Sequence, residues 1–328
     1  MASRKGLIIL RKQFKPLTCV EICAGGGGQS LGLSMAGFTH VALVELVPDY
    51  VKNMKKNRPE WPVIQSDVHD FNGKPYKNVD LFAGGVPCPP FSVAGKQLGK
   101  NDARDLFPEA LRLIKEIKPK TIMLENVRGF LDPVFDSYRK QLFDQIRELG
   151  YSNVKIKLLN ASDYGVPQLR PRVVILASRD DLGIKIDYPK PHPEDTPSVG
   201  ETLFSLMKAR GWKKAKAWAK NASGIAPTLV GGSEKHGGPD LGPTRSKKAW
   251  ADQFNVNGIS IANEAPSPDF DGMPRLTVRM LARIQSFPDQ WTFGPYKTKA
   301  CRMIGNAFPP LVAEAVGKEI ARGLRNAK

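Results

Sequence analysis

Cysteine is scarce in this chain of 328 residues, which has four: Cys19, Cys23, Cys88 and Cys301. Their spacing matches no familiar zinc-binding pattern, and a large cytosolic chain does not need disulfides. The sequence also lacks an apolar run long enough to span a bilayer, and its N-terminus lacks the cleavage site of a signal peptide. We therefore expect a cytoplasmic protein with no metal site and no membrane contact.

Positive charge, by contrast, is abundant. The chain has 49 Lys and Arg against 32 Asp and Glu, a formal net charge of +17. Basic surfaces attract polyanions because they neutralise phosphates and release counterions. Hydrophobic residues make up 41% of the chain, which is ordinary for a folded globular protein. Composition alone leaves two alternatives open, a nucleic-acid partner and a solvated basic surface.

Short apolar runs alternate with amphipathic stretches in the first half of the chain. We expect strands at 17–24, 40–46, 62–67, 79–85 and 121–127, with helices at 29–35, 48–57 and 105–117. This alternation predicts an α/β fold with a parallel sheet covered on both faces. Two later strands are indicated at 151–160 and 171–179, a helical pattern at 277–287, and a last amphipathic helix near 311–324 that packs back on the sheet.

The composition changes near Tyr188, where a proline-rich stretch indicates a domain edge. Residues 189–274 are rich in glycine, proline and lysine and have weak periodicity, so we expect a smaller, loop-rich domain there. Basic residues alternate with three tryptophans in this segment, and we expect most of the tryptophans in its core. The large domain then comprises 1–188 and 296–328, and 275–295 forms a hinge and connecting helix.

A run of four glycines, 25–28, separates the first expected strand from the first expected helix. Glycines at such a turn let the backbone approach a ligand closely. Ser30 breaks the G-x-G-x-x-G fingerprint, which disfavours a nicotinamide dehydrogenase. Glu45, about twenty residues on, has the usual position of a carboxylate that holds ribose hydroxyls, and Asp67 is placed to reach an adenine amino group. The segment predicts an adenosyl ligand; a tight turn without a ligand is the alternative.

Cys88 stands between prolines in a loop that follows the fourth expected strand. A thiolate at the carboxyl end of a strand, facing a helix N-terminus, has a depressed pKa and is a strong nucleophile. The polar stretch 92–105 contains two glycines, and we expect it to close as a lid over a bound substrate. A structural thiol in a proline-rich turn is the alternative.

Six segments, taken in order, resemble the motifs of the DNA (cytosine-5) methyltransferase family of bacterial restriction-modification systems. They are VEICAGGGGQS (the cofactor loop), GVPCPPFSVAGK (the Pro-Cys motif), LENV at 124–127, QLRPR at 168–172, RLTVRMLARIQSFPD at 275–289 and IGNAFPP at 304–310. The resemblance covers nearly the whole chain except about 189–274. It implies a DNA (cytosine-5-)-methyltransferase (EC 2.1.1.37) with a Rossmann-like S-adenosylmethionine-dependent domain and, at 189–274, a target-recognition domain.

The resemblance also implies a role for individual residues. Cys88 adds to carbon 6 of an extruded cytosine, Glu125 donates a proton at N3, Arg172 holds the base carbonyl or orients Glu125, and Arg170 serves the same site or a phosphate. Asn126 positions the turn. Expected contacts of S-adenosylmethionine are Cys23, Ala24, Gly25, Gly27, Gly28, Glu45, Asp67, Val68, Pro87, Leu106 and Asn306. Expected contacts of DNA are Ser92, Lys96, Gln168, Thr228, Leu229 and Arg245.

Three positions depart from the family pattern. Pro89 replaces a usual Gln beside the nucleophile and affects contacts near the flipped base. Cys23 replaces a Phe and weakens stacking on adenine. Met280 follows Arg279 where an Arg-Glu pair is common. None of these departures removes a residue of the central chemistry.

Two other functions stay open, an RNA cytosine-5 methyltransferase of the same fold and a DNA-binding repressor that has lost catalysis. The RNA branch has little or no target-recognition domain, so the basic segment favours DNA. The set of Cys88, Glu125, Arg172 and Asn306 favours an active enzyme. We expect a monomer that acts on double-stranded DNA at the bacterial nucleoid, with a cognate restriction endonuclease that cuts the same site.

Overall fold

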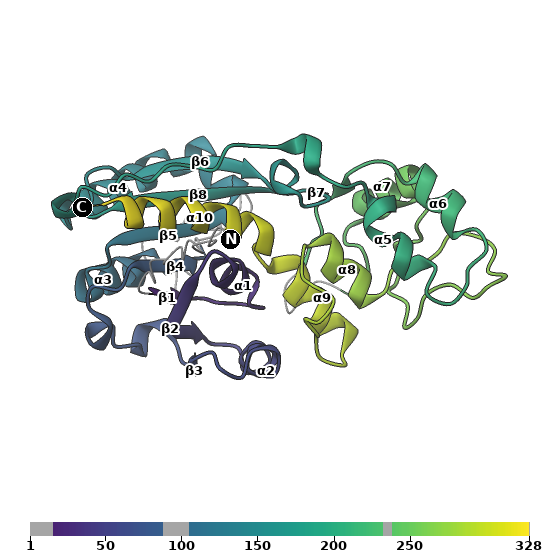
Figure 1. Ribbon diagram of the computed structural model, residues 1–328, viewed down its shortest axis with the longest axis horizontal. Coiled ribbons are helices and arrows are strands. Elements are labelled where there is room, and N and C mark those ends of the chain that lie inside the picture. The colour runs from purple at the N-terminus through teal and green to yellow at the C-terminus, as the bar shows by residue number, and fades with distance from the viewer. Residues whose placement is uncertain (1–15, 88–104, 232–237, 328) are drawn as a thin grey trace, which may run out of the picture.

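The computed structural model describes residues 16–87, 105–231 and 238–327. The strands are β1 (Leu17–Ile22), β2 (Phe38–Glu45), β3 (Val63–Gln65), β4 (Leu81–Gly85), β5 (Thr121–Val127), β6 (Lys155–Asn160), β7 (Gln168–Leu169), β8 (Pro171–Ser178) and β9 (Ala226–Pro227). The α-helices are α1 (Gly28–Met35), α2 (Pro48–Asn57), α3 (Phe107–Ile117), α4 (Asp136–Glu148), α5 (Val199–Met207), α6 (Ala215–Asn221), α7 (Thr244–Phe254), α8 (Val278–Ile284), α9 (Lys297–Asn306) and α10 (Pro310–Asn326). A body built on a sheet stands beside a group formed by helices α5–α9 (Figure 1).

The central sheet has the strand order β3-β2-β1-β4-β5-β8-β6. Pairs among the first five strands are parallel, as expected, whereas β8 pairs antiparallel with both β5 and β6. The expectation of a fully parallel sheet was therefore wrong for its last two strands. The chain from β6 to β8 is too short for the crossover that parallel pairing needs, so β8 returns alongside β6 in the opposite direction. The α/β fold class is confirmed.

Helices cover both faces of the sheet. On one face, Leu33 of α1 and Val316 and Ile320 of α10 belong to a buried cluster, and α3 and α4 contribute to a second cluster that contains residues of β1, β4 and β5. Helices α1 and α10 cross closely: a Cβ on Gly32 would lie 2.2 Å from the Pro310 carbonyl oxygen. The expectation that the last helix packs back on the first part of the chain is confirmed.

The segment expected to be loop-rich contains three helices, α5, α6 and α7. Helix α5 begins at a capping box in which Ser198 Oγ accepts from the Glu201 N–H and the Glu201 carboxylate accepts from the Ser198 N–H. Trp212, Trp218 and Trp250 are all buried, which confirms their expected place in the core. Helix α5 buries apolar residues at helical spacing, whereas α6 and α7 bury Trp218 and Trp250.

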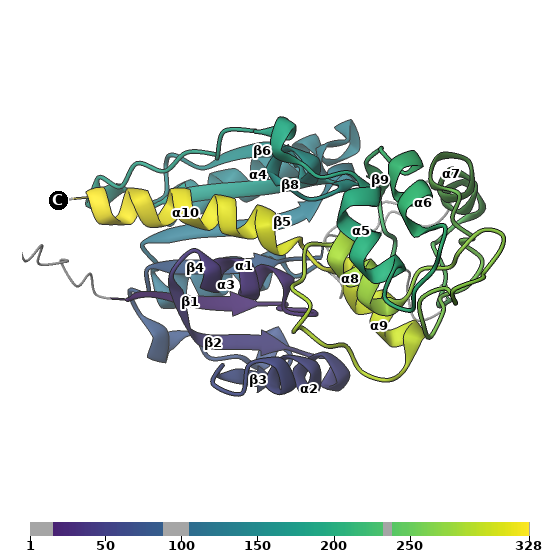
Figure 2. The same ribbon diagram turned by 45° about the vertical axis from the view of Figure 1, so that its right-hand side comes forward.

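One buried cluster extends from this helical group into the sheet-bearing body. It includes Trp218 and Trp250, Ile284 of α8 and Ile304 of α9, and it reaches Met54 of α2. The chain enters the group through the segment between β8 and α5 and returns through α9 into α10 (Figure 2). Within the group, β9 pairs parallel with β7, which lies just before β8 in the sequence. The two parts therefore share a core.

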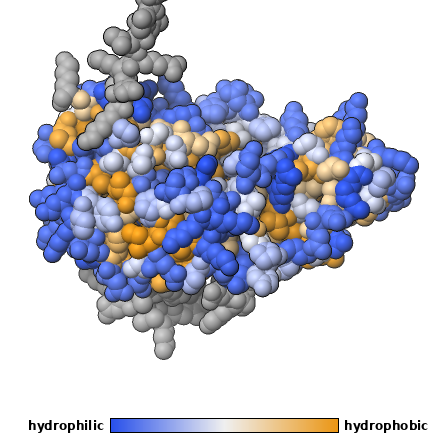
Figure 3. Space-filling model, turned by 60° about the horizontal axis from the view of Figure 1, so that its bottom comes forward, coloured by the Kyte–Doolittle hydropathy of each residue, from blue (hydrophilic) through white to orange (hydrophobic). Residues whose placement is uncertain are grey.

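Hydrophilic residues predominate on the face shown in Figure 3, where apolar residues form separate patches. Within residues 16–87, 105–231 and 238–327, no helix is long and apolar enough to cross a membrane.

Candidate functional site

A cavity of about 80 Å³ lies at the carboxyl ends of β1, β4 and β5. Ligands of open α/β sheets bind at this edge. The cavity is lined by Cys23, Ala24, Gly25, Gly26, Gly28, Gln29, Tyr50, Gly85, Glu125, Asn306, Ala307 and Phe308. Six of these residues were expected in the site from the sequence, namely Cys23, Ala24, Gly25, Gly28, Glu125 and Asn306. The structure thus joins residues from both ends of the chain.

The glycine loop between β1 and α1 turns through left-handed backbone conformations, with φ of 57° at Gly25 and 83° at Gly27. The Glu45 carboxylate ties this loop to α2: Oε2 accepts from the Gly25 N–H at 2.7 Å, and Oε1 accepts from the Val47 N–H at 2.8 Å. Burial raises the pKa of Glu45, and these backbone hydrogen bonds oppose the rise. Each carboxylate oxygen keeps a further lone pair that can accept from a ligand hydroxyl.

Cys23 lines the cavity, and burial raises the pKa of its thiol far above the usual range. This thiol therefore stays protonated near neutral pH and acts as a small packing group.

Gly27 faces away from the cavity lining: a Cβ there would lie 2.8 Å from Cζ2 of Trp291. Only glycine combines this backbone conformation with this close contact.

Asp67 and Val68 follow β3 and do not line the cavity. The Asp67 side chain is 42% exposed, and its Oδ1 accepts from both the backbone N–H and Nδ1 of His69. The hydrogen bond from the His69 backbone, followed by the one from its ring, lowers the pKa of Asp67. Pro87 comes directly before residues 88–104, which the structure does not describe, and Leu106 comes shortly after them. The Leu106 N–H donates to the Pro87 carbonyl at 3.5 Å.

Glu125 and Arg172 form an ion pair beside the cavity. The antiparallel pairing of β5 with β8 brings them together, and Arg172 Nε lies 2.9 Å from Glu125 Oε1. Burial raises the pKa of Glu125, while Arg172 and then Arg170 act in the opposite direction. Asn126 donates to the Val86 carbonyl at 2.9 Å and accepts from the Val127 N–H. Asn126 thus positions the turn, as expected.

Arg170 lies in a different environment from Arg172, since it is fully buried. Its Nη1 donates to the Leu229 carbonyl at 2.8 Å, and its Nη2 donates to the carbonyls of Gly305 at 2.6 Å and Ala307 at 3.0 Å. The expected contact of Arg170 with the base or with a phosphate is therefore corrected, because both terminal nitrogens are committed to buried carbonyl oxygens. Arg170 instead holds the turn on either side of Asn306.

Two glutamines complete this buried network. Gln168 Nε2 donates to Gln285 Oε1 at 2.6 Å, Gln285 Nε2 donates to the Ala307 carbonyl at 2.5 Å, and Gln168 Oε1 accepts from the Leu229 N–H at 2.8 Å. Gln168 and Leu229 were expected to contact DNA. That expectation is corrected, because Gln168 is fully buried and Leu229 is 4% exposed with both of its backbone groups engaged.

The remaining expected DNA contacts differ in their surroundings. Thr228 is half-buried, and its hydroxyl donates to the Leu169 carbonyl. Arg245 is exposed on α7. Cys88, Ser92 and Lys96 lie outside the described residues. The chain just after β9 also approaches the cavity lining, because a Cβ on Gly231 would lie 2.3 Å from Oδ1 of Asn306.

Sequence reasoning missed several residues of the site, most notably Gln29, Tyr50, Phe308 and Gln285. Gln29 follows the glycine run at the start of a helix. A polar residue is also common there when the helix start is exposed to solvent, so its type did not indicate a site residue. Phe308 belongs to the IGNAFPP segment, so its place next to Asn306 could have included it. Gln285 carries no local signal, since its partners lie 117 and 22 residues away in the sequence.

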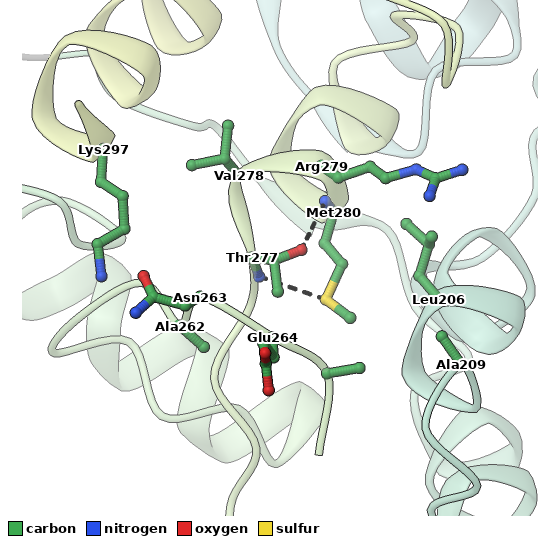
Figure 4. Close-up of a pocket in the computed structure, with 11 residues that line it drawn as sticks. Leu206, Ala209, Ala262, Asn263, Glu264, Thr277, Val278, Arg279, Met280 and Lys297 are labelled. Atoms are coloured by element: carbon green, nitrogen blue, oxygen red, sulfur yellow. Dashed lines mark hydrogen bonds between the residues drawn. The ribbon is translucent and has the colours of Figure 1, made fainter. Parts of the chain in front are cut away.

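A second cavity, of about 310 Å³, lies in the helical group between α5, α8 and the segment around Asn263 (Figure 4). At the start of α8, Thr277 Oγ1 accepts from the Met280 N–H at 3.3 Å, and Met280 Sδ lies 3.4 Å from the Thr277 N–H. Met280 thus occupies the position from which a glutamate would close a capping box, with its weaker sulfur acceptor. None of the expected site residues that the structure describes lines this cavity.

Comparisons with known proteins agree with these motifs. Residues 17–322 match the family model of the C-5 cytosine-specific DNA methylases. The chain is 52% identical over 311 residues to the Type II methyltransferase M.NgoMIV of Neisseria gonorrhoeae, covering 94% of this chain and 98% of that protein. It is 50% identical over 317 residues to M.NaeI of Lentzea aerocolonigenes, covering 95% and 76%. The solved structure of Spodoptera frugiperda DNMT2 has a similar fold, with a TM-score of 0.67 at 19% identity over 93% and 99% of the two chains.

Proposed function

This chain belongs to the C-5 cytosine-specific DNA methylase family, and from that premise we propose how it acts. It transfers a methyl group from S-adenosylmethionine to carbon 5 of a flipped cytosine in a specific double-stranded DNA sequence, through a covalent Cys88 adduct. The observation that carries the proposal is the Glu125–Arg172 pair, whose side chains are only 13% and 12% exposed and which borders the same cavity as the glycine loop and Asn306. A proton donor and a ligand-binding loop at the same edge of the sheet suit a group-transfer reaction.

The residues around the cavity fit an adenosyl cofactor. Glu45 retains acceptor capacity for ribose hydroxyls, Asp67 is accessible for an adenine amino group, and Asn306 lines the cavity with the glycine loop. Gln29 is buried with both polar atoms of its side chain unpaired within the described residues, which indicates that a polar ligand is missing from its surroundings. S-adenosylmethionine supplies an electrophilic methyl group on a sulfonium.

The chain's own residues prepare the base. The Cys88 thiolate adds to carbon 6 of cytosine, which makes carbon 5 enamine-like and nucleophilic. Negative charge then develops toward N3, where a proton from Glu125 stabilises it. The raised pKa of Glu125 supports this role, since it keeps the protonated form populated at higher pH than in an ordinary glutamate. Loss of the carbon 5 proton to water expels Cys88 as its thiolate, and return of the N3 proton to Glu125 restores the neutral aromatic base.

We assign sequence recognition to residues 189–274, because base-edge contacts alone can select a sequence and this segment is basic. Thr228 and Arg245 are the accessible residues among the DNA contacts expected within it. The names of the relatives, Type II methyltransferases, support a cognate restriction endonuclease that acts on the same site. We further propose that the enzyme acts as a monomer on DNA at the nucleoid.

Bisulfite sequencing of plasmid from cells that express this chain tests the proposal. We expect protected cytosines at one recurring sequence, and none in cells that express Cys88→Ser. Purified Cys88→Ser should lose transfer of a radiolabelled methyl group while keeping its affinity for duplex DNA, because the substitution removes only the nucleophile. Near-normal turnover by Cys88→Ser would refute the covalent mechanism. Methylation of RNA but not of duplex DNA would refute the substrate.

A further inference from the structure

Gln29 is the second residue of α1 and lies directly after the glycine loop. Its side chain is buried, with a relative exposure of 4% for the residue. Neither Nε2 nor Oε1 has a hydrogen-bond partner among the described residues. Burying an unpaired amide is unfavourable, so such a group in a native protein requires an explanation.

The surroundings of Gln29 indicate what is missing. Gln29 lines the same cavity as Glu125, Gly85 and Asn306, at the carboxyl ends of β4 and β5. It also lies in the first turn of α1, where no side chain caps the helix and the backbone N–H groups carry partial positive charge. The cavity thus offers an amide with a free donor and a free acceptor, at a helix end that favours a negative group.

The donor and acceptor of a primary amide are complementary to a zwitterion. An α-amino acid end presents a carboxylate, which accepts, next to an ammonium, which donates. The adenosine part of the cofactor, with its ribose and adenine, is already assigned to Glu45 and Asp67. Its amino acid end has no assigned side-chain partner other than Asn306.

We propose that the Gln29 amide binds the amino acid end of the cofactor, with Nε2 donating to the α-carboxylate and Oε1 accepting from the α-ammonium. This inference rests on the proposed function, because it assumes an S-adenosylmethionine site in this cavity. Gln29 then determines specificity for the aminocarboxypropyl group, whereas the glycine loop and Glu45 bind the nucleoside. An apolar side chain of the same length would fill the same space without recognising the zwitterion.

Calorimetry on the full chain tests this assignment with two ligands that share the thioadenosine. S-adenosylhomocysteine carries the amino acid end, and 5′-methylthioadenosine lacks it. Gln29→Met keeps the length of the side chain and removes both polar atoms. We expect it to weaken binding of S-adenosylhomocysteine by about 10- to 100-fold, with binding of 5′-methylthioadenosine changed less than about 2-fold. Gln145→Leu, on the exposed face of α4, is the matched control and should change neither affinity.

A second variant, Gln29→Glu, separates the two halves of the contact. It keeps an acceptor for the ammonium and places a negative charge beside the carboxylate, so we expect S-adenosylhomocysteine to bind more weakly than to the parent. Decarboxylated S-adenosylmethionine, which retains the amine, should lose less affinity for this variant than S-adenosylhomocysteine does.

Unchanged affinity of Gln29→Met for S-adenosylhomocysteine would overturn the assignment and leave a bound water as the partner of the amide. Equal losses for both ligands would overturn it too, because they would show a damaged glycine loop. In both cases the parent chain still binds the cofactor product, so the proposed function stands. A parent chain that binds neither ligand would overturn the proposed function itself, and this inference with it.

Discussion

Replacing Arg170 by methionine distinguishes a positioning role from a catalytic one. Methionine matches the length of the aliphatic stem and tolerates a buried site, but it cannot donate to the three carbonyls that Arg170 holds. The carbonyl of Ala307 keeps its bond from Gln285. The carbonyls of Leu229 and Gly305 lose the guanidinium donor and stay in a buried environment.

The expected loss of stability follows from these two carbonyls. Each unsatisfied buried acceptor is unfavourable by about 1–3 kcal/mol. Removing a buried guanidinium also relieves its desolvation, which offsets part of the loss; burial lowers the pKa of Arg170 well below its usual value, which reflects this desolvation. We therefore expect Arg170→Met to lower the free energy of unfolding by about 2–4 kcal/mol.

Urea denaturation followed by tryptophan fluorescence measures this change, with Arg322→Met as the control. Arg322 is exposed on α10 and pairs with Glu319, so its replacement should alter the free energy of unfolding by no more than about 0.5 kcal/mol. If Arg170→Met unfolded at the same urea concentration as the parent but had lost methyl transfer, Arg170 would contact the substrate. The role assigned to it from its buried hydrogen bonds would then be wrong.

Three further predictions concern the site. Glu125→Gln should lower the rate of methyl transfer by about 100-fold or more. The rate of the parent should fall as the pH rises through the raised pKa of Glu125, because the carboxyl group loses its proton, and the variant should lack this fall. A variant with the same pH–rate profile as the parent would contradict the role of Glu125 as proton donor. Glu45→Ala should weaken S-adenosylmethionine binding by about 1–3 kcal/mol in calorimetry, and unaltered affinity would contradict the placement of the ribose. Replacing residues 189–274 by the matching segment of a relative should move the methylated sequence to that of the donor in bisulfite maps, and an active chimera that kept the parental target would place the reader elsewhere.

The strands of the site could be predicted from the sequence because buried parallel strands appear as short apolar runs that end at polar residues. Glu45 was placed in this way, whereas Glu125 was placed by the resemblance of LENV to a family motif. The contact between Glu125 and Arg172 could not be predicted from local pattern, since it depends on the antiparallel return of β8 beside β5. Pairing between distant strands leaves no periodic signal in either segment.

Arg170 and Arg172 show a second limit of prediction from the sequence. Residues two apart share a face in a regular strand, so alternation alone predicts one environment for both arginines. In the structure, Arg170 lies between β7 and β8 and outside either strand. This interruption lets Arg170 bond to the turn around Asn306, while Arg172 pairs with Glu125.

The same turn explains why the proposed cofactor cavity and the proposed reader belong to one folded unit. Gly305 and Gly231 approach so closely that a Cβ on Gly305 would lie 2.3 Å from the Gly231 backbone nitrogen. Arg170 bonds to the carbonyls on both sides of Asn306 and to Leu229, two residues before Gly231. The chain after β9, in the middle of the proposed reader, is thereby fixed against a residue of the proposed cofactor cavity. Because one buried cluster also joins these parts, removing the reader would expose the core beneath the glycine loop rather than free an independent catalytic domain.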